Sequence, residues 1–178
     1  MADALERFLQ GMAAAAHLFN RAVEKKSALE CIVLQANMLD GILRVGLILK
    51  KQLDTHSSVV DQELLAQGPA DRKVSEREIY KRCRDAGVID LKLFDALSSA
   101  YDKRNECIHR YVLSEIDYDY ATRVVFELDG VLDAVKAAVW RFEHEQIQKG
   151  IGMTVAGPST SSEFLREFAS GKEKPYNL

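Results

Sequence analysis

The sequence predicts an all-α protein, a bundle of about five helices followed by a flexible C-terminal tail. Apolar residues recur at steps of three and four over most of the chain, as they do along the buried face of a helix. Helix-capping residues stand where these periodic stretches begin and end. No segment shows the sustained alternation of apolar and polar residues that a half-buried strand requires. With 47% hydrophobic residues, the chain can bury one core.

The N-terminal part of the chain predicts two helices, or one long bent helix. The first apolar stripe comprises Leu5, Phe8, Met12, Ala15, Phe19 and Val23. The second stripe runs from Ala28 to Leu53, and further apolar residues such as Val33, Leu43 and Ile48 widen it. A stripe this wide needs more than one neighbour. We therefore expect the second helix to lie at the centre of the bundle or in an oligomer interface.

Capping signals predict the next two helices. Ser75 followed by Glu78 matches a capping box, and Gly87 is suited to end the helix that this box opens. Asp90 is a preferred N-cap residue. We expect a further helix to run from residue 91 to about residue 104 or beyond.

The last long helix precedes a change in composition. Its core stripe lies between Val124 and Phe142, and Gly150 is placed to end it. The stretch GIGMTVAGPSTSS is typical of a flexible linker, and EFLREFASGKEKPYNL is typical of a short amphipathic piece or tail. The sequence therefore predicts a helical domain over residues 1–150 and a linker with a tail over residues 151–178.

Charge and cysteine content restrict the function. The chain has 24 basic and 27 acidic residues and a net charge of -3, so no general positive field draws its surface onto nucleic acid or an anionic membrane. Any RNA binding must be local. Cys31, Cys83 and Cys107 form no CxxC pair, which argues against a disulfide framework or a thiolate zinc site. This cysteine usage favours a reducing compartment.

The N-terminal residues lack the basic-then-apolar order of a signal peptide. The most apolar stretch, residues 28–49, is interrupted by Glu30, Asp40 and Arg44, which disfavours a membrane span. We expect a cytoplasmic protein with no membrane association.

The stretch KRNECIHRY, residues 103–111, stands at the end of an apolar helical stripe. Asn105 and His109 are four residues apart and share one side of a helix, whereas Arg104 and His109 are about 140° apart around it. Either the helix loosens before His109, or a second copy of the segment completes a site across a two-fold axis. Arg104 falls on the apolar stripe, where an unpaired guanidinium is costly, so it needs an anionic partner or faces a cleft.

Arg104, Asn105 and His109 resemble the R-x4-6-H motif of HEPN (higher eukaryotes and prokaryotes nucleotide-binding) domains. Tyr111 extends the likeness to R-x4-H-x-Y, the form seen in HEPN toxins paired with minimal nucleotidyltransferase antitoxins. The order of helices over residues 5–150 is also similar to HEPN, although only about eight residues carry the specific motif. The resemblance implies a homodimer whose two motifs meet in one cleft, and a metal-independent ribonuclease that needs no cofactor.

The resemblance gives these residues chemical roles. His109 would shuttle protons at working pH, because histidine has an ordinary pKa near 6.5. Arg104 would stabilise charge on the phosphate as a fixed donor fork, and Asn105 would orient the ring or a phosphate oxygen. Neighbouring Arg104 and Arg110 would favour the neutral imidazole. Tyr111 would be a candidate for adenylylation by a cognate antitoxin.

Plainer interpretations remain open at this point. Arg104 would then pair with Asp102, Glu106 or an acid of the last helix, and His109 would be an ordinary residue near a helix C-terminus. Tyr111 would be a core aromatic, and Cys107 a small buried hydrophobe. Two alternatives to a ribonuclease are also open. One is a non-catalytic HEPN module that binds nucleotide, RNA or a partner protein, and the other is a helical adaptor whose tail docks elsewhere.

A basic face is the local feature that suits RNA. Arg77, Lys81 and Arg84 follow one face of the helix opened by the capping box, with Lys103 and Arg110 in reach. They are predicted to hold a phosphate track, and the alternative is a solvated face that keeps the bundle soluble. The group formed by Asp54, His56 and Asp61 is interpreted as polar surface, so no metal is expected.

Overall fold

The computed structural model describes residues 4–65 and 74–156, which form seven α-helices and no strand. Five of these helices have ten or more residues, and the other two have four. The helices are α1 (Ala4–Glu24), α2 (Ala28–Thr55), α3 (Gln62–Leu65), α4 (Glu76–Asp85), α5 (Leu91–Arg110), α6 (Tyr118–Lys149) and α7 (Met153–Ala156). The predicted all-α bundle is confirmed. Residues 157–178, which include most of the predicted tail, lie outside the described residues.

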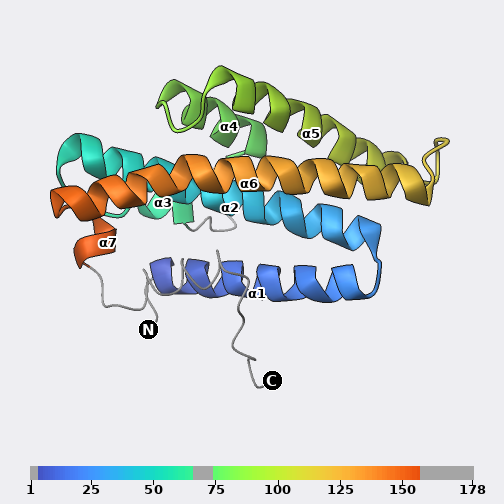
Figure 1. The fold of residues 1–178 in the computed structure, drawn as a ribbon, viewed down its shortest axis with the longest axis horizontal. Coiled ribbons are helices and arrows are strands. Elements are labelled where there is room, and N and C mark those ends of the chain that lie inside the picture. The colour runs from blue at the N-terminus through green and yellow to red at the C-terminus, as the bar shows by residue number, and fades with distance from the viewer. Residues whose placement is uncertain (1–3, 66–73, 157–178) are drawn as a thin grey trace.

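The long helices α2 and α6 form the centre of the bundle. They lie side by side, with α1 on one side of the pair and α4 and α5 on the other (Figure 1). The apolar residues of α2 spread over more than one face, so α2 packs against α1, α4, α5 and α6. Gly46 of α2 permits this close packing, because a Cβ atom there would lie 2.8 Å from both Val139 and Val88. The predicted central position of this helix is confirmed.

Local capping groups mark the start of α4, the start of α5 and the end of α6. The Ser75 hydroxyl accepts a hydrogen bond from the backbone of Glu78 at 3.3 Å, and the Asp90 carboxylate accepts one from Leu93 at 2.8 Å. Gly150 ends α6 with a φ of 66°, in the left-handed region that favours glycine. These boundaries confirm the capping predictions.

Asp117 also caps α6, through a hydrogen bond of 2.7 Å from the backbone of Tyr120. This cap was not predicted. The apolar stripe that marked the helix in the sequence begins only at Val124, seven residues later.

The helix α2 is long and apolar enough, by length and composition, to span a bilayer. In the structure, 72% of its most apolar window is buried by the other helices. A buried core helix passes the same test, so this feature assigns no membrane.

Two glutamines join the C-terminal ends of α2 and α6. Gln52 and Gln146 are fully buried, and the Gln146 amide donates to the Gln52 side-chain oxygen at 2.9 Å. Backbone and hydroxyl groups of Met153 and Thr154 donate to the two amide oxygens. The described part of the predicted linker, residues 151–156, therefore includes α7 and packs on the bundle through this network.

A buried arginine of α2 contacts the residues on either side of the stretch between α3 and α4. Arg44 of α2 pairs with Asp40 at 2.7 Å and donates to the backbone carbonyls of Leu64 and Val74. These two carbonyls flank residues 66–73, which lie outside the described residues. The side chain thus fixes both flanks of that stretch to the central helix.

Candidate functional site

The helix α5 carries the whole Arg-Asn-x3-His motif without a break. It extends from Leu91 to Arg110, so the helix does not loosen before His109. Arg104 and His109 therefore remain about 140° apart around one axis. The His109 side chain is exposed, whereas Arg104 is turned toward α4 and its side chain is only 14% exposed. One chain does not bring the two residues to a common point.

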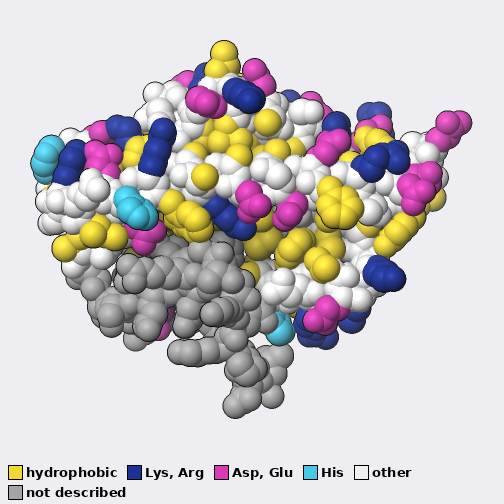
Figure 2. All heavy atoms as spheres, in the orientation of Figure 1, with side chains coloured by type: hydrophobic (Ala, Val, Ile, Leu, Met, Phe, Trp, Pro, Cys, Tyr) yellow, Lys and Arg dark blue, Asp and Glu magenta, His cyan; other side chains and the backbone are white. Residues whose placement is uncertain are grey.

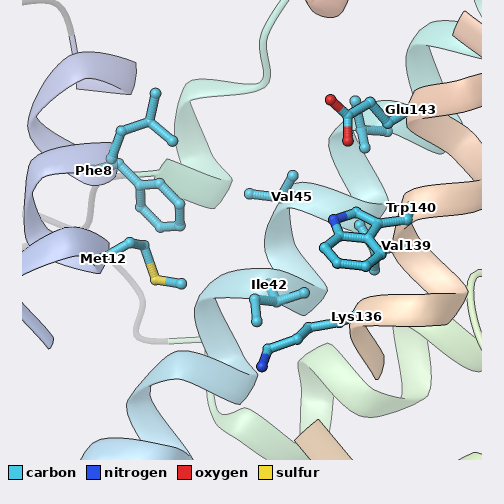
Figure 3. Close-up of a pocket in the computed structure, with 10 residues that line it drawn as sticks. Phe8, Met12, Ile42, Val45, Lys136, Val139, Trp140 and Glu143 are labelled. Atoms are coloured by element: carbon cyan, nitrogen blue, oxygen red, sulfur yellow. The ribbon is translucent and has the colours of Figure 1, made fainter. Parts of the chain in front are cut away.

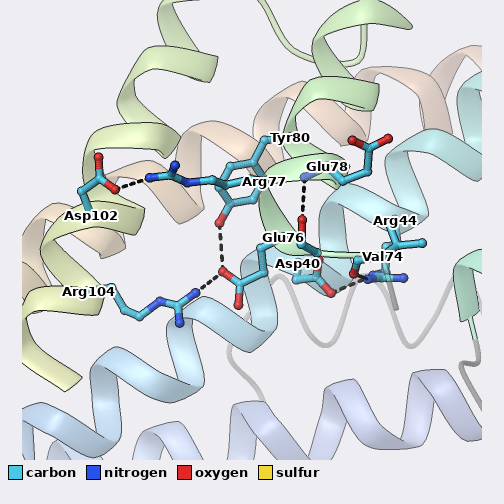
Figure 4. A network of polar contacts seen from close by, with 10 residues as sticks. Asp40, Arg44, Val74, Glu76, Arg77, Glu78, Tyr80, Asp102 and Arg104 are labelled. Atoms are coloured by element: carbon cyan, nitrogen blue, oxygen red, sulfur yellow. Dashed lines mark hydrogen bonds and ion pairs between the residues drawn. The ribbon is translucent and has the colours of Figure 1, made fainter. Parts of the chain in front are cut away.

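Arg104 forms an ion pair with Glu76, the first residue of α4 (Figure 4). Its guanidinium also lies 4.7 Å from the centre of the Tyr101 ring, a favourable distance for a cation–π contact. The Nε atom of Arg104 is buried and has no hydrogen-bond partner among the described residues. The guanidinium is thus paired in charge but only partly satisfied in hydrogen bonding.

The plainer interpretation named other acids as partners of Arg104, and the two neighbouring ones, Asp102 and Glu106, have other partners in the structure. Asp102 pairs with Arg77 of α4 (Figure 4). Glu106 accepts a hydrogen bond of 2.8 Å from the Tyr120 hydroxyl of α6. Asp102 and Glu106 lie two residues from Arg104 on either side, about 200° away around the helix, so neither shares its face.

Two tyrosines complete the surroundings of Arg104. The guanidiniums of Arg77 and Arg104 each lie 4.7 Å from the centre of the Tyr101 ring. Tyr80 meets Tyr101 edge-on with ring centres 6.3 Å apart, and its hydroxyl lies 3.5 Å from the Glu76 carboxylate. Burial, together with the nearby negative charge of Glu76, raises the pKa of Tyr80 well above its ordinary value. Tyr80 is therefore a neutral hydrogen-bond donor at physiological pH.

The other face of α5 presents the remaining motif residues. His109 is exposed and Asn105 is half-buried. Neither side chain forms a hydrogen bond or an ion pair within residues 4–65 and 74–156. Both side chains are therefore available to an external partner.

Tyr111 and Cys107 have structural surroundings. Tyr111 follows α5 directly and packs, partly buried, against the main core. Cys107 is fully buried, and this burial raises the pKa of its thiol. The expectation that Cys107 is a buried hydrophobe is confirmed. The predicted modification of Tyr111 stays a prediction.

Carboxylates accompany three of the five residues predicted to bind RNA. Arg77 pairs with Asp102, and Lys103 of α5 pairs with Glu127 of α6. Arg84 pairs with the adjacent Asp85 at 2.7 Å and stacks on Phe94. Lys81 and Arg110 are exposed and form no ion pair with the part of the chain that the structure describes. Basic and acidic side chains are interspersed on the face drawn in Figure 2.

A separate apolar pocket lies between α1, α2 and α6 (Figure 3). Apolar side chains from all three helices line it, with Trp140, Lys136 and Glu143 contributed by α6. No residue of the Arg-Asn-x3-His motif belongs to it. The sequence pattern assigned Phe8 and Met12 to the core stripe of one helix and gave no sign that the facing helices leave a space beside them.

The acids of the candidate metal group are engaged by lysines. Asp54 pairs with Lys50, and Asp61 pairs with Lys51 at 2.8 Å. The hydrogen bond from Lys51 holds the pKa of Asp61 below its ordinary value. Within the described ranges, no three His, Cys, Asp or Glu side chains are grouped closely enough to hold a metal ion.

Comparisons with known proteins identify no relative of this chain. No family model matches the chain, and neither the curated proteins nor the solved structures contain a significant match. The resemblance to HEPN domains therefore rests on the motif and on the order of helices.

Proposed function

We propose that this protein is a metal-independent endoribonuclease of the HEPN type, with the cellular role of a bacterial toxin or phage-defence factor in the cytoplasm. One observation carries the proposal: the motif Arg-Asn-x3-His lies on an unbroken helix, and its histidine is exposed and unpaired among the described residues. An exposed imidazole is free to exchange protons with a bound substrate.

The active unit is a homodimer. Because α5 is continuous, Arg104 and His109 point about 140° apart, and a second copy of α5 would supply the missing half of each site. Val112 and Leu113 support this arrangement, since they follow the motif directly and are 91% and 86% exposed. Burial of such side chains between two copies would be favourable.

The proposed RNA cleavage needs only the histidine, arginine and asparagine side chains of the motif. His109 acts as general base and removes the proton of a ribose 2′-hydroxyl, which attacks the adjacent phosphorus. The bond to the 5′-oxygen of the next nucleotide breaks, and that oxygen takes a proton from water, while the protonated His109 returns its proton to the solvent. The products are a 2′,3′-cyclic phosphate and a 5′-hydroxyl. Arg104 stabilises the charge on the phosphate oxygens, and Asn105 orients the imidazole or the phosphate.

The test is cleavage of labelled cellular RNA in EDTA by wild type and by His109→Ala. Removal of a general base lowers the rate by about 100-fold or more, so the variant should lose a cleavage that leaves cyclic phosphate ends. Circular dichroism establishes that the variant is folded, and His144→Ala is a matched control because His144 is also exposed, on α6. Equal cleavage by wild type and His109→Ala would contradict the proposal.

The pairing of Arg104 with Glu76 favours a second candidate function. A non-catalytic HEPN module would bind nucleotide, RNA or a partner protein, such as a cognate antitoxin, and would use the arginine only structurally. This alternative predicts no cleavage by wild type on a broad RNA panel, and binding that His109→Ala leaves unchanged.

A further inference from the structure

Arg104 has surroundings typical of an anion-binding site, and the Glu76 carboxylate takes the place of the anion. The guanidinium donates through Nη2 to the Glu76 carboxylate, and Tyr101 lies against its face. The two ionic side chains are 14% and 26% exposed. The pair is therefore partly shielded from water, which makes its electrostatic attraction stronger than that of a surface pair.

The guanidinium is not saturated by this partner. Its Nε atom is buried and has no acceptor among the described residues. A buried donor without an acceptor is unfavourable, and a ligand with two adjacent oxygens would engage both Nη2 and Nε in the bidentate geometry that arginine favours. The structure thus contains a donor that the resting arrangement does not use.

Glu76 is placed so that it can leave this position. It is the first residue of α4, directly after Ser75, and the start of the helix is capped by the Ser75 hydroxyl, which accepts from the backbone of Glu78, rather than by the Glu76 side chain. Its carboxylate is the more exposed member of the pair. Rotation of the side chain would carry the carboxylate into water without disturbing α4.

We propose that Glu76 is an internal competitor that occupies a phosphate site at Arg104, and that a phosphodiester displaces it when substrate binds. A phosphodiester and a carboxylate carry the same single negative charge, so the exchange leaves the charge balance of Arg104 unchanged. This inference deepens the proposed ribonuclease function and rests on it for the identity of the ligand. The same chemistry would admit inorganic phosphate.

The competition lowers the affinity of the resting protein for its substrate. Part of the binding energy is used to move Glu76 away from Arg104, so the catalytic arginine becomes available only when a phosphate is present. Replacement of the carboxylate by an amide of the same shape would remove the competitor. Tyr80 would then retain a hydrogen-bond acceptor, since its hydroxyl faces position 76.

The experiment compares Glu76→Gln with Asp102→Asn. Each substitution removes one negative charge from the same α4–α5 region, but Asp102 pairs with Arg77, in a pair that is 58% and 66% exposed. Both variants therefore gain equally from any non-specific attraction to polyanions. The probes are a fluorescent single-stranded 2′-O-methyl oligoribonucleotide, which lacks the attacking hydroxyl, and inorganic phosphate.

Glu76→Gln should bind the oligoribonucleotide about tenfold more tightly than wild type in fluorescence anisotropy, because loss of a charge-assisted hydrogen bond frees the arginine. Asp102→Asn frees Arg77, another residue predicted to bind RNA, but from an exposed ion pair of little strength, so it should bind only about twofold more tightly than wild type or less. The double variant Glu76→Gln, Arg104→Ala should lose the gain. Inorganic phosphate should raise the melting temperature of Glu76→Gln more than that of wild type.

The outcomes separate this inference from the proposed function. If phosphate stabilises Glu76→Gln through Arg104 but neither protein binds or cleaves RNA, the anion site stands and the ribonuclease does not. If RNA is cleaved in a His109-dependent way but folded Glu76→Gln binds no more tightly than wild type, the inference alone is wrong. Weaker binding by Glu76→Gln, or no binding of either probe by any variant, also overturns it.

Discussion

Two of the polar networks that join helices in the described residues, one at Gln52 and Gln146 and one at Arg104 and Glu76, differ in how completely their hydrogen bonds are made. Gln52 and Gln146 join α2, α6 and α7 at full burial, and every nitrogen and oxygen of the two amides has a partner. Arg104 and Glu76 join α5 and α4 at partial exposure, and the arginine Nε has no partner in the described chain. The first network is complete, and the second is not.

The difference indicates different roles. A fully satisfied buried network specifies one packing and has nothing to offer a ligand. A partly exposed network with an unsatisfied donor contributes less to stability than a complete one and retains a donor for an external acceptor. Incomplete hydrogen bonding at Arg104 therefore supports binding chemistry there better than the charge of the arginine alone does.

Gln146→Leu should produce the largest loss of stability. It removes the amide from a fully buried site, and leaves the Thr154 hydroxyl and the Gln52 oxygen with fewer partners. We expect the free energy of unfolding to fall by about 2–3 kcal/mol. Urea denaturation measures this, and Gln148→Leu, at an exposed position of the same helix, is the matched control. A smaller loss in the free energy of unfolding for Gln146→Leu than for Gln148→Leu would contradict the structural role assigned to the Gln52 and Gln146 network.

Arg104→Met should have a smaller effect on stability. The methionine keeps part of the packing against Tyr101, and Glu76 can turn toward water once its partner is gone. We expect a loss of about 1 kcal/mol or less in the free energy of unfolding, measured in the same urea experiment. A loss as large as that of Gln146→Leu would show that the Arg104 network is structural, contrary to the role proposed here.

Tyr120→Phe should have the smallest effect, with a characteristic pH dependence. The Tyr120 hydroxyl donates to Glu106 across α5 and α6, and this hydrogen bond raises the pKa of Tyr120 to about 12. A raised pKa means that the contribution is complete below the unfolded value near 10 and is lost as pH rises toward 12. Tyr120 is half-buried, but its hydrogen bond to Glu106 is exposed to solvent, so we expect a contribution of about 0.5 kcal/mol at pH 8.

The measurement is the difference in unfolding free energy between wild type and Tyr120→Phe from pH 8 to pH 11.5. It should shrink above pH 10. A difference that stays constant over this range would show that the hydroxyl does not interact with Glu106 in solution.

Local signals in the sequence predicted the helices well. Ser75, Asp90 and Gly150 act within a few residues of their own position, so their roles could be predicted without knowledge of the fold. The angle between Arg104 and His109 was likewise a property of one helix. It held because α5 continues to Arg110.

The pairings between helices could not be predicted in the same way. Glu76 is 28 residues from Arg104, and only the packing of α4 on α5 brings the two together. Gln52 and Gln146 are polar residues that a hydrophobic pattern places on the surface, whereas the structure buries them opposite each other. The chemical surroundings of the motif therefore required tertiary structure.

In the proposed ribonuclease, two copies of the chain complete a site from Arg104 of one and His109 of the other. Complementation tests it most directly: Arg104→Ala and His109→Ala are refolded together, and cleavage of labelled RNA is measured in EDTA. Each variant alone should be inactive. The mixture should regain about a quarter of wild-type activity, because half of the dimers are mixed and each mixed dimer has one intact site of two. An inactive mixture of folded mixed dimers, beside an active wild type, would contradict the composite site.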